Sequence, residues 1–258
     1  MTELKLVVLG SSASAPAPGD ACSGYLVRHG ETRVLLDCGT GTLSRLLQEG
    51  ETLDRLSAIV VSHFHPDHYL DLVTMRYGLR YGVRKAPRLV LLVPPNGQHF
   101  LRLLGDALRR NPEFFDAAFV ITEYQPTEPT CVGELRLTFC RTTHDEPTWA
   151  VSVAAPDGNR LVYTGDTRPC AELEVFARDA TLLLCESTYP GDAGELPSDN
   201  HLTSVEAGCL ARRAAAKQLM LTHFWAEFPR ERFAPGAETA YGAPVRLAAP
   251  GVKVVVRA

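Results

Sequence analysis

The chain has 258 residues, of which 45% are hydrophobic and 22% charged, an ordinary globular composition with enough length to bury a substantial core. Its net charge of −4 argues against a generally basic surface for nucleic acid, and no apolar run is long enough to cross a membrane. No repeat, linker or low-complexity segment divides the chain, so residues 1–258 are expected to form a single domain.

The amino-terminal part of the chain is predicted to form strands that end in turns. Strands are expected over 4–9, 23–28 and 32–37, and the turn between the last two indicates a hairpin. His29 lies in that turn and is expected to be solvated. The glycine-rich loop Asp37-Cys38-Gly39-Thr40-Gly41 follows and leads into an amphipathic stretch with helical spacing. Its Gly-x-Gly pattern alone is a weak signal for phosphate binding.

A short buried strand over 58–62 leads to the most informative segment, His63-Phe64-His65-Pro66-Asp67-His68. Three imidazoles and one carboxylate fall within six positions, although the chain has only 8 histidines, so chance is a weak explanation. Imidazole and carboxylate donors without thiolate suit zinc, with manganese or iron as alternatives. Pro66 is predicted to begin a helix that includes Leu79.

The rest of the chain continues with strands and interleaved helices. Helices are predicted over 100–109 and 205–217. Strands are predicted over 89–93, 119–123, 135–142, 150–154, 161–164, 181–186, 218–222 and 252–256. Each half of the chain has its own run of strands, which favours a layered α/β domain over a helical bundle or a plain β-sandwich.

Four more metal-binding side chains directly follow or end predicted strands: His144, Asp166, Glu186 and His223. Sheets of this kind place binding sites at the carboxyl ends of strands, so we expect these residues near the histidine cluster. Each alone would more often be a turn residue. Together, the donors could hold two ions with an open position for water. His63, His65 and His144 would bind one ion, Asp67, His68 and His223 the other, and Asp166 would bridge them.

These pieces strongly resemble the metallo-β-lactamase superfamily, from Leu35-Leu36-Asp37-Cys38-Gly39-Thr40-Gly41 through the histidine cluster to Tyr163-Thr164-Gly165-Asp166-Thr167 and His223. The resemblance covers nearly the whole chain. It implies a four-layer αβ/βα sandwich with a binuclear zinc site at one edge. An aspartate at 166 fits the phosphodiesterase, glyoxalase and lactonase branches, because the lactamases usually carry cysteine there.

The segment His201-Leu202-Thr203-Ser204-Val205-Glu206-Ala207 is similar to the extra histidine motif of the tRNase Z-like phosphodiesterases. The resemblance implies that His201, backed by Glu186, handles the proton for the leaving oxygen. A capping box at Thr203 and Glu206 would explain those two residues but not His201.

The chain departs from true tRNase Z enzymes at one place. Their flexible arm, which grips tRNA, lies between the third histidine motif and the bridging aspartate. Here His144 and Asp166 are 22 positions apart, enough for a hairpin only. A modest basic stretch is more typical of a solvated helix face than of a nucleic-acid surface. It comprises Arg76, Arg80, Arg84, Lys85 and Arg88. The substrate expected is therefore a small phosphodiester or nucleotide, with tRNA disfavoured, and a homodimer is compatible with the family.

The expected activity is that of a binuclear zinc-dependent phosphodiesterase that uses a metal-bridging hydroxide. Asp67 would orient or deprotonate the nucleophile, and protonated His201 would donate to the departing alkoxide. Asp37 would either fix a ligand histidine through its other ring nitrogen or be only a turn residue. The alternatives are a lactone, thioester or β-lactam hydrolase, a tRNA 3′-processing endoribonuclease, and a metal-stabilised binding protein without turnover.

The cysteines and the first residues bear on the cellular compartment. The 7 cysteines are an odd number and include no C-x-x-C pair. The first residues lead directly into an apolar, strand-like run, so no signal peptide is expected. Scattered cysteines without a signal peptide are typical of reduced, mostly buried thiols. These features predict a cytoplasmic protein.

Overall fold

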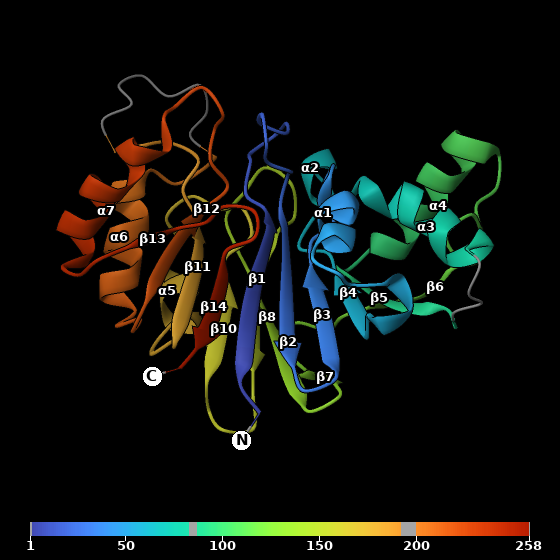
Figure 1. Ribbon diagram of the computed structural model, residues 1–258, viewed down its shortest axis with the longest axis horizontal. Coiled ribbons are helices and arrows are strands. Elements are labelled where there is room, and N and C mark those ends of the chain that lie inside the picture. Colours follow the sequence, from blue (N-terminus) through green and yellow to red (C-terminus); the bar gives the residue numbers. More distant parts are fainter. Residues whose placement is uncertain (1, 83–86, 192–199, 258) are drawn as a thin grey trace.

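Two seven-stranded β-sheets pack face to face, and helices cover the outer side of each (Figure 1). They are seen in a computed structural model of the chain that describes residues 2–82, 87–191 and 200–257. The strand orders within these residues are β14-β1-β2-β3-β4-β5-β6 and β13-β12-β11-β10-β9-β8-β7. The arrangement is the four-layer αβ/βα sandwich predicted from the sequence.

The first sheet combines an antiparallel and a parallel half. Its strands are β1 (Leu4–Gly10), β2 (Gly24–His29), β3 (Thr32–Leu36), β4 (Ala58–Val60), β5 (Leu89–Val93), β6 (Phe119–Glu123) and β14 (Lys253–Val256). Strands β14, β1, β2 and β3 pair antiparallel, whereas β3 to β6 pair parallel. Its helices are α1 (Thr42–Gln48), α2 (Pro66–Tyr69), α3 (Asp71–Tyr81) and α4 (Gly97–Arg109), with a 3-10 turn at Leu53–Arg55.

The second sheet has the same mixed character. Its strands are β7 (Thr130–Val132), β8 (Leu135–Arg141), β9 (Trp149–Ala154), β10 (Arg160–Tyr163), β11 (Leu182–Glu186), β12 (Leu219–Thr222) and β13 (Arg246–Leu247). Strands β7 to β10 pair antiparallel and β10 to β13 pair parallel. Helices α5 (Ala171–Phe176), α6 (Ser204–Arg213) and α7 (Phe233–Tyr241) cover its outer face, with a 3-10 turn at Arg230–Arg232.

The hydrophobic core forms on both faces of the first sheet. On β1, Leu6 and Val8 belong to the core that includes the facing strands of the second sheet. Val7 and Leu9 point the other way and join the core beneath α3 and α4. Because successive side chains in a strand alternate between faces, burial on both faces requires the continuous apolar run seen in the sequence.

Some expectations about local structure were wrong. His29 is not solvated: it is buried, and its Nδ1 lies 3.5 Å from the Glu134 carboxylate. Arg76 is also buried, where its Nε donates to the Phe114 carbonyl at 3.0 Å. Helix α6 ends at Arg213, four residues early, because Ala215 adopts a left-handed backbone with φ of 49°.

The basic stretch of the sequence is only partly described. Arg80 and Arg88 are exposed, as a solvated surface would require, whereas Arg84 and Lys85 lie outside the described residues. Among the helices that are described, none is long and apolar enough to cross a membrane.

Candidate metal centre

The candidate site lies where the strands of both sheets end, at the edge that carries α2 (Figure 1). Parallel strands end on the same side of a sheet, so the residues that follow them are brought together. Asp37 and His223 directly follow β3 and β12 with left-handed backbones, at φ of 58° and 59°. Such conformations are costly for residues other than glycine, and they concentrate at functional sites.

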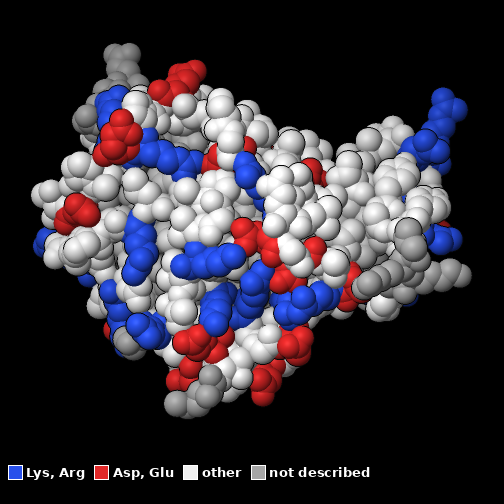
Figure 2. Space-filling model, in the orientation of Figure 1, with Lys and Arg blue, Asp and Glu red and all other residues white. Residues whose placement is uncertain are grey.

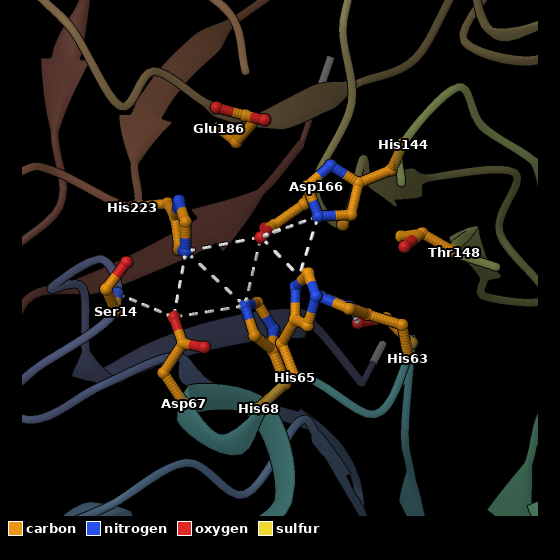
Figure 3. A network of polar contacts seen from close by, with 12 residues as sticks. Ser14, His63, His65, Asp67, His68, His144, Thr148, Asp166, Glu186 and His223 are labelled. Atoms are coloured by element: carbon orange, nitrogen blue, oxygen red, sulfur yellow. Dashed lines mark hydrogen bonds and ion pairs between the residues drawn. The ribbon is translucent and has the colours of Figure 1, made fainter. Parts of the chain in front are cut away.

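The predicted ligands converge in two groups (Figure 3). In the first group, donor atoms of His63, His65, His144 and Asp166 all lie within 4.8 Å of one another. In the second, those of Asp67, His68 and His223 do the same. The two groups match the division expected from the sequence, while their role as metal ligands stays a prediction.

Asp166 is at the centre of both groups. Its Oδ2 lies 3.3 Å from His68 Nε2 and 3.5 Å from His223 Nε2. The same oxygen lies 3.6 Å from His63 Nε2 and 3.9 Å from His144 Nε2. A single carboxylate oxygen therefore faces one nitrogen of each of these four histidines, the position that a bridging ligand would occupy. The Nδ1 of His201 also lies 3.9 Å from it.

The spacing of these atoms fits divalent metal ions. Ligand atoms about 2.1 Å from a tetrahedral zinc lie about 3.4 Å from one another, close to the separations around Asp166. Among the described residues, buried His63 Nε2 and Asp166 Oδ1 have no hydrogen-bond partner. Unpartnered buried polar atoms are unfavourable, and bound cations would satisfy them.

Charges in the centre also suit a cation. Burial, reinforced by His68, holds the pKa of the His63 imidazole well below its usual range. Burial opposes charge on His68 too, but the Asp166 and Asp67 carboxylates raise the pKa of His68 well above its usual value. Burial likewise opposes ionisation of Asp166, yet the surrounding histidines hold its pKa well below the usual range. Asp166, which faces both groups, therefore favours its ionised form.

Asp37 orients two of the histidines. Its Oδ2 accepts hydrogen bonds from His68 Nδ1 at 2.7 Å and from Ser62 Oγ at 2.8 Å. His63 Nδ1 in turn lies 3.0 Å from Ser62 Oγ and donates to it. Tyr163 donates a further bond to Oδ2 at 2.7 Å. With their Nδ1 protons engaged, both rings present Nε2 to the centre, so the predicted contact between Asp37 and a histidine of the site is confirmed.

Glu186 plays the same part on the opposite side. Its Oε1 lies 3.0 Å from His201 Nδ1, and its Oε2 accepts from Thr188 Oγ1 at 2.9 Å. His223 Nδ1 donates to Thr188 Oγ1 at 2.9 Å. Burial opposes charge on His201, but the Glu186 carboxylate raises its pKa to about 9. Two buried carboxylates thus each hold one histidine directly and a second through a hydroxyl group.

Several orienting residues were missed by sequence reasoning. The Ser14 amide donates to Asp67 Oδ2 at 2.7 Å, and His144 Nδ1 lies 3.0 Å from the Asn200 carbonyl oxygen. These contacts use the backbone, which any residue type supplies, so the sequence carries no signal for them. Thr188 could have been found, because it lies two positions beyond Glu186 at the end of a buried strand.

Comparison with known proteins decides the family. Residues 32–224 match the family model described as the beta-lactamase superfamily domain. The chain belongs to the metallo-β-lactamase superfamily. Its match spans the histidine cluster, Asp166 and His223, which are the residues on which the resemblance was based.

Relatives within the superfamily include metallo-hydrolases and ribonuclease Z enzymes. The chain is 31% identical over 255 residues to the probable metallo-hydrolase YhfI of Bacillus subtilis, covering 96% of this chain and 98% of that protein. Ribonuclease Z of Myxococcus xanthus is 30% identical, with 98% of each chain covered. The crystal structure of YhfI superimposes with a TM-score of 0.86 at 26% identity, covering 97% of this chain and 99% of that one.

Substitution of Tyr163 by Phe is expected to lower the stability of the protein without changing its metal content or activity. The variant loses the hydroxyl that donates to Asp37 at 2.7 Å, while the ring remains in the core. Loss of one such bond should lower the free energy of unfolding by about 1–2 kcal/mol, measured by urea denaturation. Metal content and activity should stay within about twofold, since Asp37 keeps its contact with His68. A loss of metal binding would show that Tyr163 is needed to position Asp37.

Substitution of Thr203 by Ala is expected to affect only the helix that follows. Thr203 and Glu206 form the predicted capping box at the start of α6. Its removal should cost about 1 kcal/mol of stability, measured by thermal unfolding. Activity should remain close to that of the wild type, because the Glu186 contact of His201 does not involve Thr203. A large loss of activity at unchanged stability would contradict this separation.

Proposed function

We propose that the chain is a metal-dependent phosphodiesterase that binds two divalent ions, zinc or alternatively manganese or iron, and hydrolyses a small phosphodiester or nucleotide. His63, His65 and His144 would hold one ion, Asp67, His68 and His223 the other, and Asp166 would contact both. When bound, the ions would supply a nucleophile at neutral pH and neutralise charge on the phosphoryl group. The superfamily and the metallo-hydrolase and ribonuclease Z relatives support a hydrolase.

The observation that carries the phosphodiesterase proposal is the pairing of His201 with Glu186. The ring of His201 lies 5.0 Å from that of His144 and 5.3 Å from that of His223, measured between centroids. Its Nδ1 is fixed by the Glu186 carboxylate at 3.0 Å. The remaining nitrogen, Nε2, is then available to donate a proton to an alkoxide leaving from the phosphorus. A thiolate leaving from a thioester would need no such donor.

Asp67 would act on the attacking water, whereas His201 would act on the leaving oxygen. Its Oδ2 lies 3.2 Å from His223 Nε2 and accepts the Ser14 amide at 2.7 Å. These contacts hold the carboxylate at the second group, where it can orient a water for attack. A water aligned in this way and a proton donor at the leaving oxygen are the two positions that an in-line displacement requires.

Features of the fold favour a small substrate over tRNA. Strands β9 and β10 and their connecting turn take up most of the stretch between His144 and Asp166, with no room for an arm. On the face of the molecule seen in Figure 2, lysine and arginine side chains are interspersed with acidic ones and form no continuous basic surface. Transfer-RNA processing remains the alternative that the ribonuclease Z relatives favour.

A substrate panel tests the proposal. Zinc- or manganese-loaded protein would be offered bis(p-nitrophenyl) phosphate, cyclic nucleotides, a precursor tRNA, a lactone and a thioester. Hydrolysis of small phosphodiesters, with little on the acyl substrates, is expected. Strong activity on the lactone or thioester with none on any phosphodiester would overturn the proposal, and specific cleavage of precursor tRNA alone would establish the alternative.

A further inference from the structure

A pocket of about 320 Å³ opens beside the metal centre. It lies between the amino-terminal end of α4 and the segment that leads into β9. Three aromatic rings and the His99 imidazole contribute to its walls, together with an exposed leucine and two side chains of opposite charge. The lining used below comprises Phe64, Phe100, Leu103, Arg141, Glu146 and Trp149.

The pocket and the metal centre share a wall. Phe64 lies between His63 and His65 in the sequence, and Glu146 is two residues beyond His144. The backbone amide of Trp149 donates to the Ser62 carbonyl at 3.2 Å, directly before the first ligand histidine. In Figure 3 Thr148, the neighbour of Trp149, lies on the side of the centre away from His223. A group bound in this pocket would therefore lie beside the predicted ligand histidines.

The walls suit a flat, uncharged group. Phe64 and Phe100 are stacked, with ring centroids 4.2 Å apart and planes 22° from parallel, so this wall is ordered in advance. Arg141 and Glu146 balance in charge. The first two amides of α4 are already engaged, since Gly97 donates to the Pro94 carbonyl and Gln98 to the Glu123 carboxylate. The pocket is therefore poorly suited to a second phosphate.

The polar groups of the pocket suit the edge of a heterocycle. Arg141 offers donors and Glu146 an acceptor on the pocket. The indole Nε1 of Trp149 has no acceptor among the residues described, but it is shielded from solvent, so the ring of Trp149 and not this nitrogen contributes to the pocket wall. Aromatic faces combined with donors and an acceptor at the edge are the features by which proteins hold nucleobases.

We propose that this pocket binds the nucleobase of a nucleotide phosphodiester, the substrate class of the proposed function, on which this inference rests. The base would belong to the group retained on the phosphate. The leaving oxygen would depart on the side of His201, whose partner Glu186 ends β11, an element that does not line the pocket.

The kinetic test compares two substrates with the same leaving group, thymidine 5′-(p-nitrophenyl phosphate) and methyl p-nitrophenyl phosphate. The nucleoside ester is expected to have a kcat/KM at least about tenfold higher, in line with the contribution of base stacking. Leu103→Glu, which places a charge in the pocket at a side chain 59% exposed, should remove that preference. Leu108→Glu, on the same helix but outside the pocket lining, should retain it. Equal kcat/KM for both esters in the wild-type protein would overturn the inference.

A binding measurement tests the nucleobase pocket without relying on catalytic activity. The chain has 2 tryptophans, so the Trp225→Phe variant leaves only Trp149 to report on the pocket. Thymidine monophosphate should quench this fluorescence saturably, whereas ribose 5-phosphate should not, and Leu103→Glu should weaken the quenching about tenfold. If neither ester is cleaved, the proposed function fails, and quenching by the nucleotide alone would still support a base-binding pocket. No quenching, or equal quenching by ribose 5-phosphate, would overturn it.

Discussion

Replacement of Asp166 by Ala is expected to abolish hydrolysis and to remove metal from the protein. The carboxylate oxygen lies 3.3 to 3.9 Å from the Nε2 atoms of four predicted ligand histidines, and it contacts both predicted sets. Loss even of a residue that only orients a ligand typically weakens metal binding 10- to 100-fold, and loss of the shared ligand should exceed that range. Metal analysis after gel filtration and kcat/KM on a phosphodiester would measure both effects.

Asp145 supplies the matched control for this variant. Its carboxylate lies 3.1 Å from His144 Nε2, but its side chain is 56% exposed. Solvent screens a carboxylate at such a position, so Asp145→Ala should keep its metal and lose less than about tenfold in activity. If Asp166→Ala retained two ions, or if both variants lost activity equally, the bridging role would be refuted.

Replacement of His201 by Ala is expected to slow the chemical step without loss of metal. General acid catalysis typically contributes 10²- to 10⁴-fold, and kcat on a dinucleotide should fall by about that factor. On bis(p-nitrophenyl) phosphate the decrease should be much smaller, because p-nitrophenolate departs without a proton. The difference between the two substrates identifies His201 as a proton donor rather than as a structural residue.

Thr203→Ala serves as the control for a general disturbance near His201. It alters a residue two positions beyond His201 but leaves the contact between His201 and Glu186 in place. Equal losses on both substrates in His201→Ala, or a lowered metal content, would indicate that the histidine binds metal or maintains the loop instead.

Much of the fold and the candidate site could be predicted from the sequence for one physical reason. Residues that follow parallel strands meet at one edge of a sheet, so Asp166 and His223 could be placed beside the histidine cluster without a structure. The long apolar strands were also recognisable, because β1 is buried on both faces and needs an unbroken apolar run. Asp37 could be expected near a histidine from its position at a strand end.

The remaining features depend on tertiary contacts that leave no local pattern. Strand β13 has two residues and is defined by pairing with β12, and α5 and α7 are short helices that pack on the second sheet. Ser14 reaches Asp67 across 53 positions through a backbone amide. His29 appeared to be a turn residue, but it is buried, and the turn between β7 and β8 places the Glu134 carboxylate 3.5 Å from its Nδ1. These outcomes follow from how the two sheets meet, which neither periodicity nor composition specifies.

The most direct test of the central claim is the rate of bis(p-nitrophenyl) phosphate hydrolysis as zinc or manganese is added back to metal-free protein. If the two groups of ligands each hold an ion, the rate should rise until two equivalents per chain are bound and then remain constant. A plateau at one equivalent, or two bound ions without phosphodiester hydrolysis, would contradict the assignment of a binuclear phosphodiesterase.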